Sequence, residues 1–171
     1  MGKKIKKKSN RKRQIIGRKD KADFPSLKLK KLEVKIDTGA FTSAIHCEYI
    51  SLSEDGKSLT FSLLDPTHKA HHGNPFTFTK FRKRKIRSSN GYLEERFLIE
   101  ANIKLFEKTF PIELALTDRS NMNTPVLLGR RLLRAHFLVD VSKVDLSYTQ
   151  QRKKKKAAKK AAKSSSESPK T

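Results

Sequence analysis

The stretch LEVKIDTGA, residues 32–40, decides the fold that this sequence predicts. Its apolar residues recur at every second position and alternate with charged ones, a period typical of a half-buried β-strand. The strand ends at Asp37, and Thr38 and Gly39 follow at once. A carboxylate is therefore presented on a tight turn directly after a buried strand, where glycine permits a close approach of the backbone. The same three residues can also serve only to cap a turn through side-chain hydrogen bonds.

Asp37 cannot cleave a peptide bond alone. Aspartic chemistry uses two facing carboxylates that share a proton and hold a water between them. One carboxylate takes a proton from the water while the other hydrogen-bonds the substrate carbonyl, and the pair titrates as a unit. Because Asp-Thr-Gly occurs once in the sequence, the second carboxylate would come from an identical chain across a two-fold axis. This reading predicts a homodimer.

A second signal for this chemistry follows about 90 residues later. The run VLLGRRLL, residues 126–133, places an apolar triplet before Gly129 and Arg130 and then begins a helical pattern, predicted over 129–135. Beside the Asp37 turn, hydroxyl residues at 42 and 43 can hold the loop by hydrogen bonds. These two features favour a catalytic role for the turn over simple capping.

Short strand signals fill the middle of the chain. Asn90-Gly91 is the strongest hairpin signal, because both central residues of a type I′ turn need positive φ. The alternation over 27–36 breaks at Lys30-Lys31, which predicts a bulge or turn in that strand. Many short strands separated by Gly, Pro and Asn turns predict an all-β barrel or sandwich. Besides 27–36, the predicted strands are 60–64, 76–79, 81–87, 92–103, 110–116 and 126–128.

Together these parts resemble the retropepsins, which pair a DTGA turn with a later apolar strand that ends in Gly-Arg before a short helix. A closer resemblance covers about residues 15–148. It is to the bacterial family often labelled "ATP-dependent zinc protease", regarded as retropepsin-like and encoded near ATP-grasp ligases that add glutamates to a ribosomal protein. The resemblance implies an all-β, closed retropepsin-like barrel (the acid protease fold) with one short C-terminal helix. It rests on the runs IIGRKD at 15–20, KIDTGAFTSAIHC at 35–47, IRSSNGYLEERFLI at 86–99, IELALTDRSNMNTPVLLGRRLL at 112–133 and FLVDVSKVDLSY at 137–148.

The resemblance also implies roles for individual residues. Asp37 would be the catalytic carboxylate, and Thr38 would grip its counterpart across the dimer. Gly39 would form the turn, with Ala40 supporting it. Gly129 would pack under the active-site loop and Arg130 would brace that loop.

The chain departs from the retroviral pattern in two places. Retroviral members follow DTGA with acidic residues that can pair with the arginine, whereas residues 41–43 here are Phe, Thr and Ser. Asp118 and Asp140 are the candidates to replace that partner of Arg130. The glycine-rich flap of the viral enzymes is also missing, and the hairpin signal makes Ser88, Ser89, Asn90 and Gly91 the predicted loop over the substrate.

No cofactor and no metal site are expected from the residues, despite the family label. His68, His71 and His72 lie in a loop rich in Gly, Pro and Asn, without the rigid H-E-x-x-H helix or the spaced Cys pairs of zinc sites. His46 and Cys47 are neighbours on a strand, so their side chains point to opposite faces. No G-x-x-x-x-G-K-[ST] run is present to hold ATP.

The net charge of +23 is concentrated at the two ends of the chain. Residues 1–13 carry eight Lys/Arg and no acid, and residues 151–171 carry nine and one acid. We therefore predict a disordered basic arm at 1–14, a retropepsin-like domain at 15–149 and a disordered Lys/Ala/Ser tail at 150–171. Such tails neutralise phosphates without reading sequence, which suggests non-specific contact with RNA or the ribosome. The alternative is that they only increase solubility.

The sequence favours a cytoplasmic protein without membrane contact, because it has no apolar run of about 18 residues and no signal-peptide core. The leading prediction is a homodimeric aspartic endopeptidase that acts on a protein or peptide substrate, including one that bears acidic residues. The alternative is a non-catalytic retropepsin-like module, recruited to the ribosome, RNA or an acidic protein by its basic tails.

Overall fold

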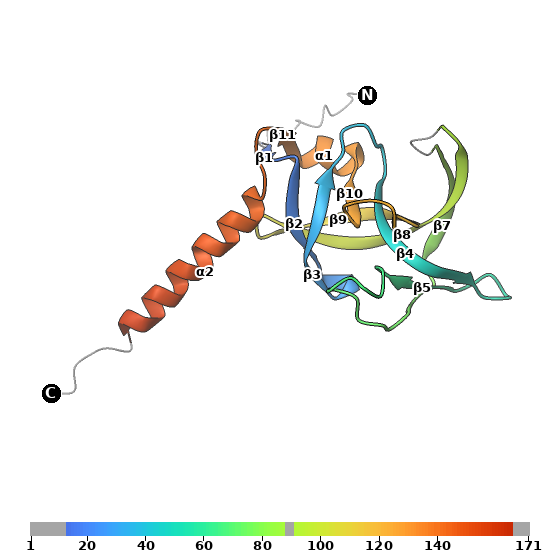
Figure 1. The fold of residues 1–171 in the computed structure, drawn as a ribbon, viewed down its shortest axis with the longest axis horizontal. Coiled ribbons are helices and arrows are strands. Elements are labelled where there is room, and N and C mark those ends of the chain that lie inside the picture. The colour runs from blue at the N-terminus through green and yellow to red at the C-terminus, as the bar shows by residue number, and fades with distance from the viewer. Residues whose placement is uncertain (1–12, 88–90, 166–171) are drawn as a thin grey trace, which may run out of the picture.

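The computed structural model describes residues 13–87 and 91–165, which form a closed β-barrel (Figure 1). Neighbouring strands of the barrel are hydrogen-bonded in the order β10, β3, β2, β8, β9, β4. Strand β10 pairs in parallel with β3 and antiparallel with β4, and this double pairing closes the ring. The strands are β2 (Lys19–Phe24), β3 (Leu29–Ile36), β4 (Ser43–Leu52), β8 (Leu93–Leu105), β9 (Lys108–Thr117) and β10 (Val126–Leu128). The predicted all-β retropepsin-like barrel is confirmed.

Outside this ring, the described residues form five further strands and three helical segments. Strands β5 (Leu59–Leu63) and β6 (Phe76–Phe78) continue the sheet from β4, and β7 (Phe81–Arg87) pairs with β8. Strands β1 (Gln14–Ile16) and β11 (Phe137–Val139) form a separate parallel pair. The helical segments are the short 3₁₀ turn η1 (Pro25–Leu27), α1 (Arg130–His136) and α2 (Leu146–Ser165).

The core lies inside the barrel because alternate strand residues point inward. In β3 the buried positions follow the sequence pattern, with Leu32, Val34 and Ile36 inside and the intervening charged residues exposed. The predicted bulge is present at Lys31, whose φ is 52° and whose amide donates to the carboxylate of Asp23. The largest fully buried side chains include Phe24, Phe61, Leu27, Leu29, Ile45, Ile99 and Ile103.

The hairpin predicted at Asn90-Gly91 joins β7 to β8, which pair antiparallel from Phe81↔Ile99 to Arg87↔Leu93. Gly91 has the positive φ of 85° that this signal requires. Residues 88–90 lie outside the described residues. The helix predicted over 129–135 is α1, displaced by one residue.

The predicted disordered tail from residue 150 is wrong as far as Ser165, because α2 continues to that residue. Low complexity excludes a packed core, but Ala, Lys, Arg and Gln are good helix formers and need no core to adopt a helix. At the other end, the predicted arm lies outside the described residues except for Arg13 and Gln14, and Gln14 begins β1. Among the described residues, no helix is both long enough and apolar enough to cross a membrane.

Candidate active site

The Asp37 loop, residues 37–42, lies where β3 ends beside β10. The amide of Asp37 donates to the carbonyl of Leu128 at 3.0 Å and so continues the β3–β10 ladder by one residue. Strand β10 is paired on its other edge with β4, which begins at Ser43. Strands β3 and β4 therefore fix the two ends of the loop, and β10 fixes the segment that packs beneath it.

Main-chain amides orient the Asp37 carboxylate. Its Oδ1 accepts hydrogen bonds from the amides of Gly39 at 2.9 Å and Ala40 at 3.1 Å. Within the described part of the chain, Oδ2 accepts no hydrogen bond. The side chain is thus held by one oxygen in a half-buried position, and the other oxygen is available to a water, a substrate or another carboxylate.

Gly129 lies against the loop so closely that no side chain fits there. A Cβ added at this residue would lie 2.8 Å from the carbonyl oxygen of Phe41 and 2.8 Å from the carbonyl carbon of Thr42. Its amide donates to the hydroxyl of buried Ser43 at 3.0 Å. The sequence signals at 37–40 and 126–133, which lie far apart in the chain, therefore meet in one structure.

Arg130 binds the main chain of the Asp37 loop and not a carboxylate. Its Nη1 donates to the carbonyls of Thr38 and Gly39, each at 3.0 Å, and its amide donates to the carbonyl of Ala40 at 2.8 Å. The expectation that Asp118 or Asp140 would replace the missing acidic partner is wrong. A guanidinium has five N–H donors and can donate to carbonyl oxygens as well as to carboxylates. The Asp37 loop presents two carbonyl oxygens side by side to Arg130.

Both rejected aspartates have partners elsewhere. Asp118 accepts from the amide of Ser120 at 2.8 Å. Asp140 accepts from the amide and the hydroxyl of Ser142, and it pairs with Lys143 at 3.7 Å.

The family comparison bears directly on this arrangement. A family model, RimB-like, described as retropepsin-like aspartic endopeptidase RimB, matches residues 15–153. This chain belongs to the RimB-like family. The matched residues contain the Asp37 loop, β10 and α1, the elements that form the candidate site.

Curated relatives are longer proteins with a different name. A probable alpha-L-glutamate ligase of Shewanella halifaxensis is 33% identical over 131 residues, covering 75% of this chain and 29% of that protein. A probable alpha-L-glutamate ligase of Desulfotalea psychrophila is 31% identical over 134 residues, covering 75% of this chain and 28% of that protein. The chain therefore spans less than a third of the length of these relatives.

A solved structure has the same fold over nearly its whole length. It is the Legionella pneumophila protein Lpg0085, of unknown function, which is 28% identical to this chain. The match has a TM-score of 0.62 and covers 78% of this chain and 98% of that one.

Sequence reasoning missed one residue of the site, Arg119. Burial lowers the pKa of its guanidinium, nearby Arg96 lowers it further, and the Asp37 carboxylate opposes both effects. The side chain donates to the carbonyl of Thr124 at 3.3 and 3.4 Å. Arg119 therefore lies within electrostatic reach of the candidate carboxylate. The sequence feature that could have indicated Arg119 is its position in the segment that leads into β10.

His46 positions the segment that carries Arg119. Its amide donates to the carbonyl of Pro125 at 2.8 Å, and its Nδ1 accepts from the amide of Arg119 at 2.7 Å. Because Nδ1 is an acceptor in this bond, the 3.6 Å approach of Asp118 to the same atom is not a hydrogen bond. His46 thus ties residues 119–125 to β4 and sets the place of Arg119.

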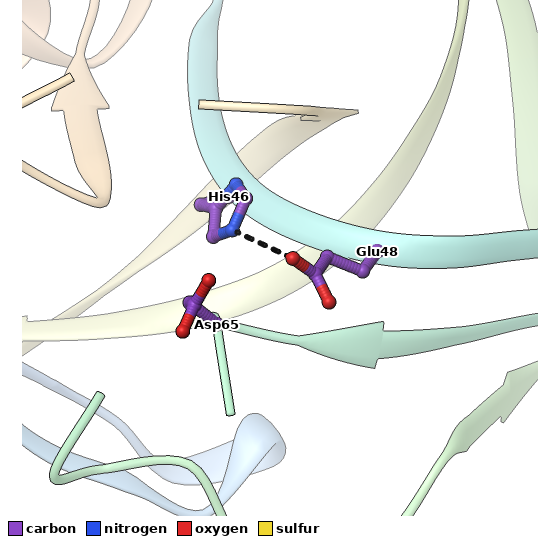
Figure 2. Close-up of side chains that lie close together, drawn as sticks. All are labelled: His46, Glu48 and Asp65. Carbon is purple, nitrogen blue, oxygen red and sulfur yellow. Dashed lines mark ion pairs between the residues drawn. The ribbon is translucent and has the colours of Figure 1, made fainter. Parts of the chain in front are cut away.

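His46, Glu48 and Asp65 form a group whose donor atoms lie within 4.8 Å of one another, the spacing of a metal site (Figure 2). The residues do not fit a metal. A neutral imidazole has one lone pair, and that of His46 is used at Nδ1. Its buried Nε2 therefore carries the hydrogen and lies 3.9 Å from a Glu48 oxygen. A nitrogen that carries hydrogen cannot be a ligand.

The other histidines also have separate partners. His71 Nδ1 contacts the carbonyls of Leu63 and Leu64 at 3.0 and 3.2 Å. His68 Nδ1 accepts from the amide of Ala70, and burial lowers the pKa of His68. The ring of His72 packs against Phe76. This arrangement fits side chains that hold their own loop together.

Proposed function

We propose that this chain is a homodimeric aspartic endopeptidase in which the Asp37 carboxylates of two copies hold and activate one water. The observation that carries the proposal is the state of the Asp37 carboxylate, with Oδ1 fixed by two amides and Oδ2 without a protein partner in the described residues. Membership of the RimB-like family supports the same reaction. A single copy supplies half of the required pair.

The geometry favours the proposed chemistry because the loop holds the carboxylate without neutralising it by an ion pair. In the dimer, one carboxylate would take a proton from the water while its protonated copy donates to the scissile carbonyl oxygen. The amides of Gly39 and Ala40 would keep Oδ1 in place throughout. Thr38 is exposed and its carbonyl is held by Arg130, so its hydroxyl is available to the second copy.

The substrate that fits the surroundings is an acidic polypeptide rich in glutamate. Arg119 would attract carboxylates toward Asp37. A groove that includes Arg119 is also lined by Lys28, Lys30, Lys31 and Lys69. The probable glutamate ligases among the relatives support glutamate-containing protein as the substrate class.

The test is cleavage of a glutamate-rich fluorogenic peptide by the wild type and Asp37→Asn. The substitution keeps the size of the side chain and removes the group that exchanges the proton, so we expect cleavage to fall by about 10³-fold or more. Asp23→Asn, another loop-binding carboxylate away from the site, is the matched control and should retain activity. Sedimentation should give the same oligomeric state for all three proteins. Full activity of Asp37→Asn would contradict the proposal.

A second candidate is a binding module without peptidase activity. It is favoured by the fact that the matched region forms less than a third of proteins named as probable ligases, within which a substrate-holding role would suffice. This candidate predicts that wild type and Asp37→Asn bind the glutamate-rich peptide equally and that neither cleaves it. Peptide binding and cleavage measured on the same samples separate the two candidates.

A further inference from the structure

Helix α2 is fixed to the barrel at its first turn. The carboxylate of Asp20, buried in β2, accepts from the amides of Ser147 at 2.8 Å and Tyr148 at 3.1 Å. The hydroxyl of Ser147 in turn accepts from the amide of Phe106 at 2.7 Å. A carboxylate at a helix N-terminus satisfies free amides and complements the helix dipole. The start of α2 therefore has a defined place on the body.

Beyond this anchor the helix leaves the barrel and projects outward (Figure 1). Every side chain described from Arg152 to Ala162 is exposed. Over its full length α2 has eight Lys/Arg positions and no acidic one. Lys154 is paired with Glu107 of the body. A helix of 20 residues is about 30 Å long, so this element carries a dense array of positive charge away from the barrel.

The cations of α2 repel one another. Lysines or arginines lie four positions apart at 152/156, 155/159 and 156/160. Like charges at this spacing destabilise a helix, and the side chains described from 152 to 162 are all exposed, so packing on the body does not offset that effect there. A polyanion that surrounds the helix would relieve the repulsion. The element is therefore better suited to a bound state than to free solution.

The chemistry of the helix selects among anionic partners. A membrane surface needs large apolar side chains to insert, and the apolar residues from 149 to 165 are four alanines, at 157, 158, 161 and 162. The same segment contains no aromatic residue on which single-stranded bases could stack. An extended acidic peptide would meet one side of the helix, whereas the consecutive cations at 152–156 point to all sides of it. A duplex presents two phosphate strands to opposite sides of a helix that lies along a groove.

We propose that α2 is a docking element for the phosphate backbone of double-stranded nucleic acid and that it binds without reading base sequence. It places the barrel, and with it the Asp37 site, at a nucleic-acid surface. The proposal is independent of whether the barrel cleaves peptides, because it rests on α2 and its anchor alone.

The test is binding of the full chain to a duplex of about 20 base pairs, as DNA and as RNA of the same sequence, across a salt series. The test variant replaces Lys155, Lys156, Lys159 and Lys160 with Gln, which keeps helix propensity and removes four charges. The control variant replaces Lys57, Lys80, Lys85 and Lys108, all exposed on the body, with Gln. Both variants keep the basic residues 1–13 and have the same net charge.

Binding should weaken in the α2 variant and change little in the control. Each phosphate contact contributes about one unit to the slope of log affinity against log salt, so the slope should fall by about 3 to 4 units in the α2 variant alone. Equal binding to DNA and RNA indicates docking on the backbone, and preference for DNA indicates entry into the wider major groove; both support the proposal.

Two results would overturn it. One is an equal loss in both variants, which would assign binding to net charge and not to α2. The other is a polyglutamate chain that binds the wild type more tightly than either duplex and loses that advantage in the α2 variant, which would assign the helix to an acidic protein. Circular dichroism of each variant checks that α2 still forms.

Discussion

At the Asp37 loop the charged groups are held by main-chain partners, whereas along α2 the charged groups stand in solvent. Asp37 is oriented by two amides, and Arg130 binds two carbonyls of the same loop. In α2, main-chain groups of the first turn are tied to the body through Asp20, and beyond that turn the described tie is the ion pair of Lys154 with Glu107. The proposed function of the loop therefore depends on the exact positions of a few atoms, whereas the proposed function of α2 depends on how many positive charges it carries. Single substitutions should therefore damage the loop far more than the helix.

Among substitutions outside Asp37 itself, Gly129→Ala should have the largest effect, because the new Cβ would lie 2.8 Å from the main chain of the Asp37 loop. We expect the loop to shift, cleavage to fall by about 100-fold and unfolding free energy to fall by about 1–3 kcal/mol. Peptidase assays and urea unfolding measure the two quantities.

Gly17→Ala is the control, since its Cβ would also meet main chain, even more closely, at the carbonyl oxygen of Lys143, but between β1 and β2 and not in the Asp37 loop. It should lose stability and keep its activity at temperatures where it is folded. Equal loss of activity in both variants would show that Gly129 acts through general stability and not through the loop.

Arg130→Gln should have the next largest effect. The shorter, neutral side chain loses the two hydrogen bonds to the carbonyls of Thr38 and Gly39, so we expect cleavage to fall by about tenfold. Because Arg130 is exposed, its stability loss should be no more than about 1 kcal/mol. Arg134→Gln, whose contact with the described residues is over the ring of Phe41, should keep its cleavage rate. A wild-type rate in Arg130→Gln would mean that the loop needs no brace.

Asp20→Ala tests the other region. Loss of the cap should lower unfolding free energy by about 1–2 kcal/mol and release the first turn of α2, with cleavage unchanged. Urea unfolding and amide exchange at residues 147 and 148 measure these effects. A fall in cleavage rate comparable to that of Gly129→Ala would contradict the separation of the two regions.

Asp20 also has a pH signature. Burial raises the pKa of Asp20, although the amides of Ser147, Lys21 and Tyr148 act in the opposite direction. Because the folded pKa lies above the unfolded one, protonation favours the folded state, and that contribution is lost as pH rises through the folded pKa. As pH rises through the folded pKa of Asp20, the unfolding free energy of the wild type should fall relative to that of Asp20→Asn, which urea unfolding at several pH values measures. An opposite slope would mean that hydrogen bonding outweighs burial.

The smallest expected effect is a change in the rate at which the Cys47 thiol is labelled. Cys47 lies on β4, the strand that begins at the end of the Asp37 loop. Its exposed surface is 2%, and burial raises the pKa of its thiol to about 12. A maleimide should therefore label the folded protein slowly at neutral pH. Labelling should be faster in Gly129→Ala and unchanged in Asp20→Ala. Rapid labelling of the wild type would mean that β4 opens readily.

The sequence predicts the Asp37 loop well and α2 poorly, for physical reasons. Alternation in 32–36 and the Gly-Arg after 126–128 are local patterns, so β3, β10 and α1 follow from them. The place of Arg119 depends on hydrogen bonds from β4 to residues 119 and 125, which are 73 or more positions away and leave no periodic signal. Helix α2 was missed because low complexity was taken to mean disorder, although its residues favour a helix.

A crystal structure of the dimer, with measurement of the distance between the two Asp37 carboxylates, tests the central claim most directly. The account predicts that the two side chains face each other within about 3 Å, with each Oδ1 still bound by the amides of its own loop. Two copies joined through another face, with their Asp37 side chains separated by bulk solvent, would contradict it.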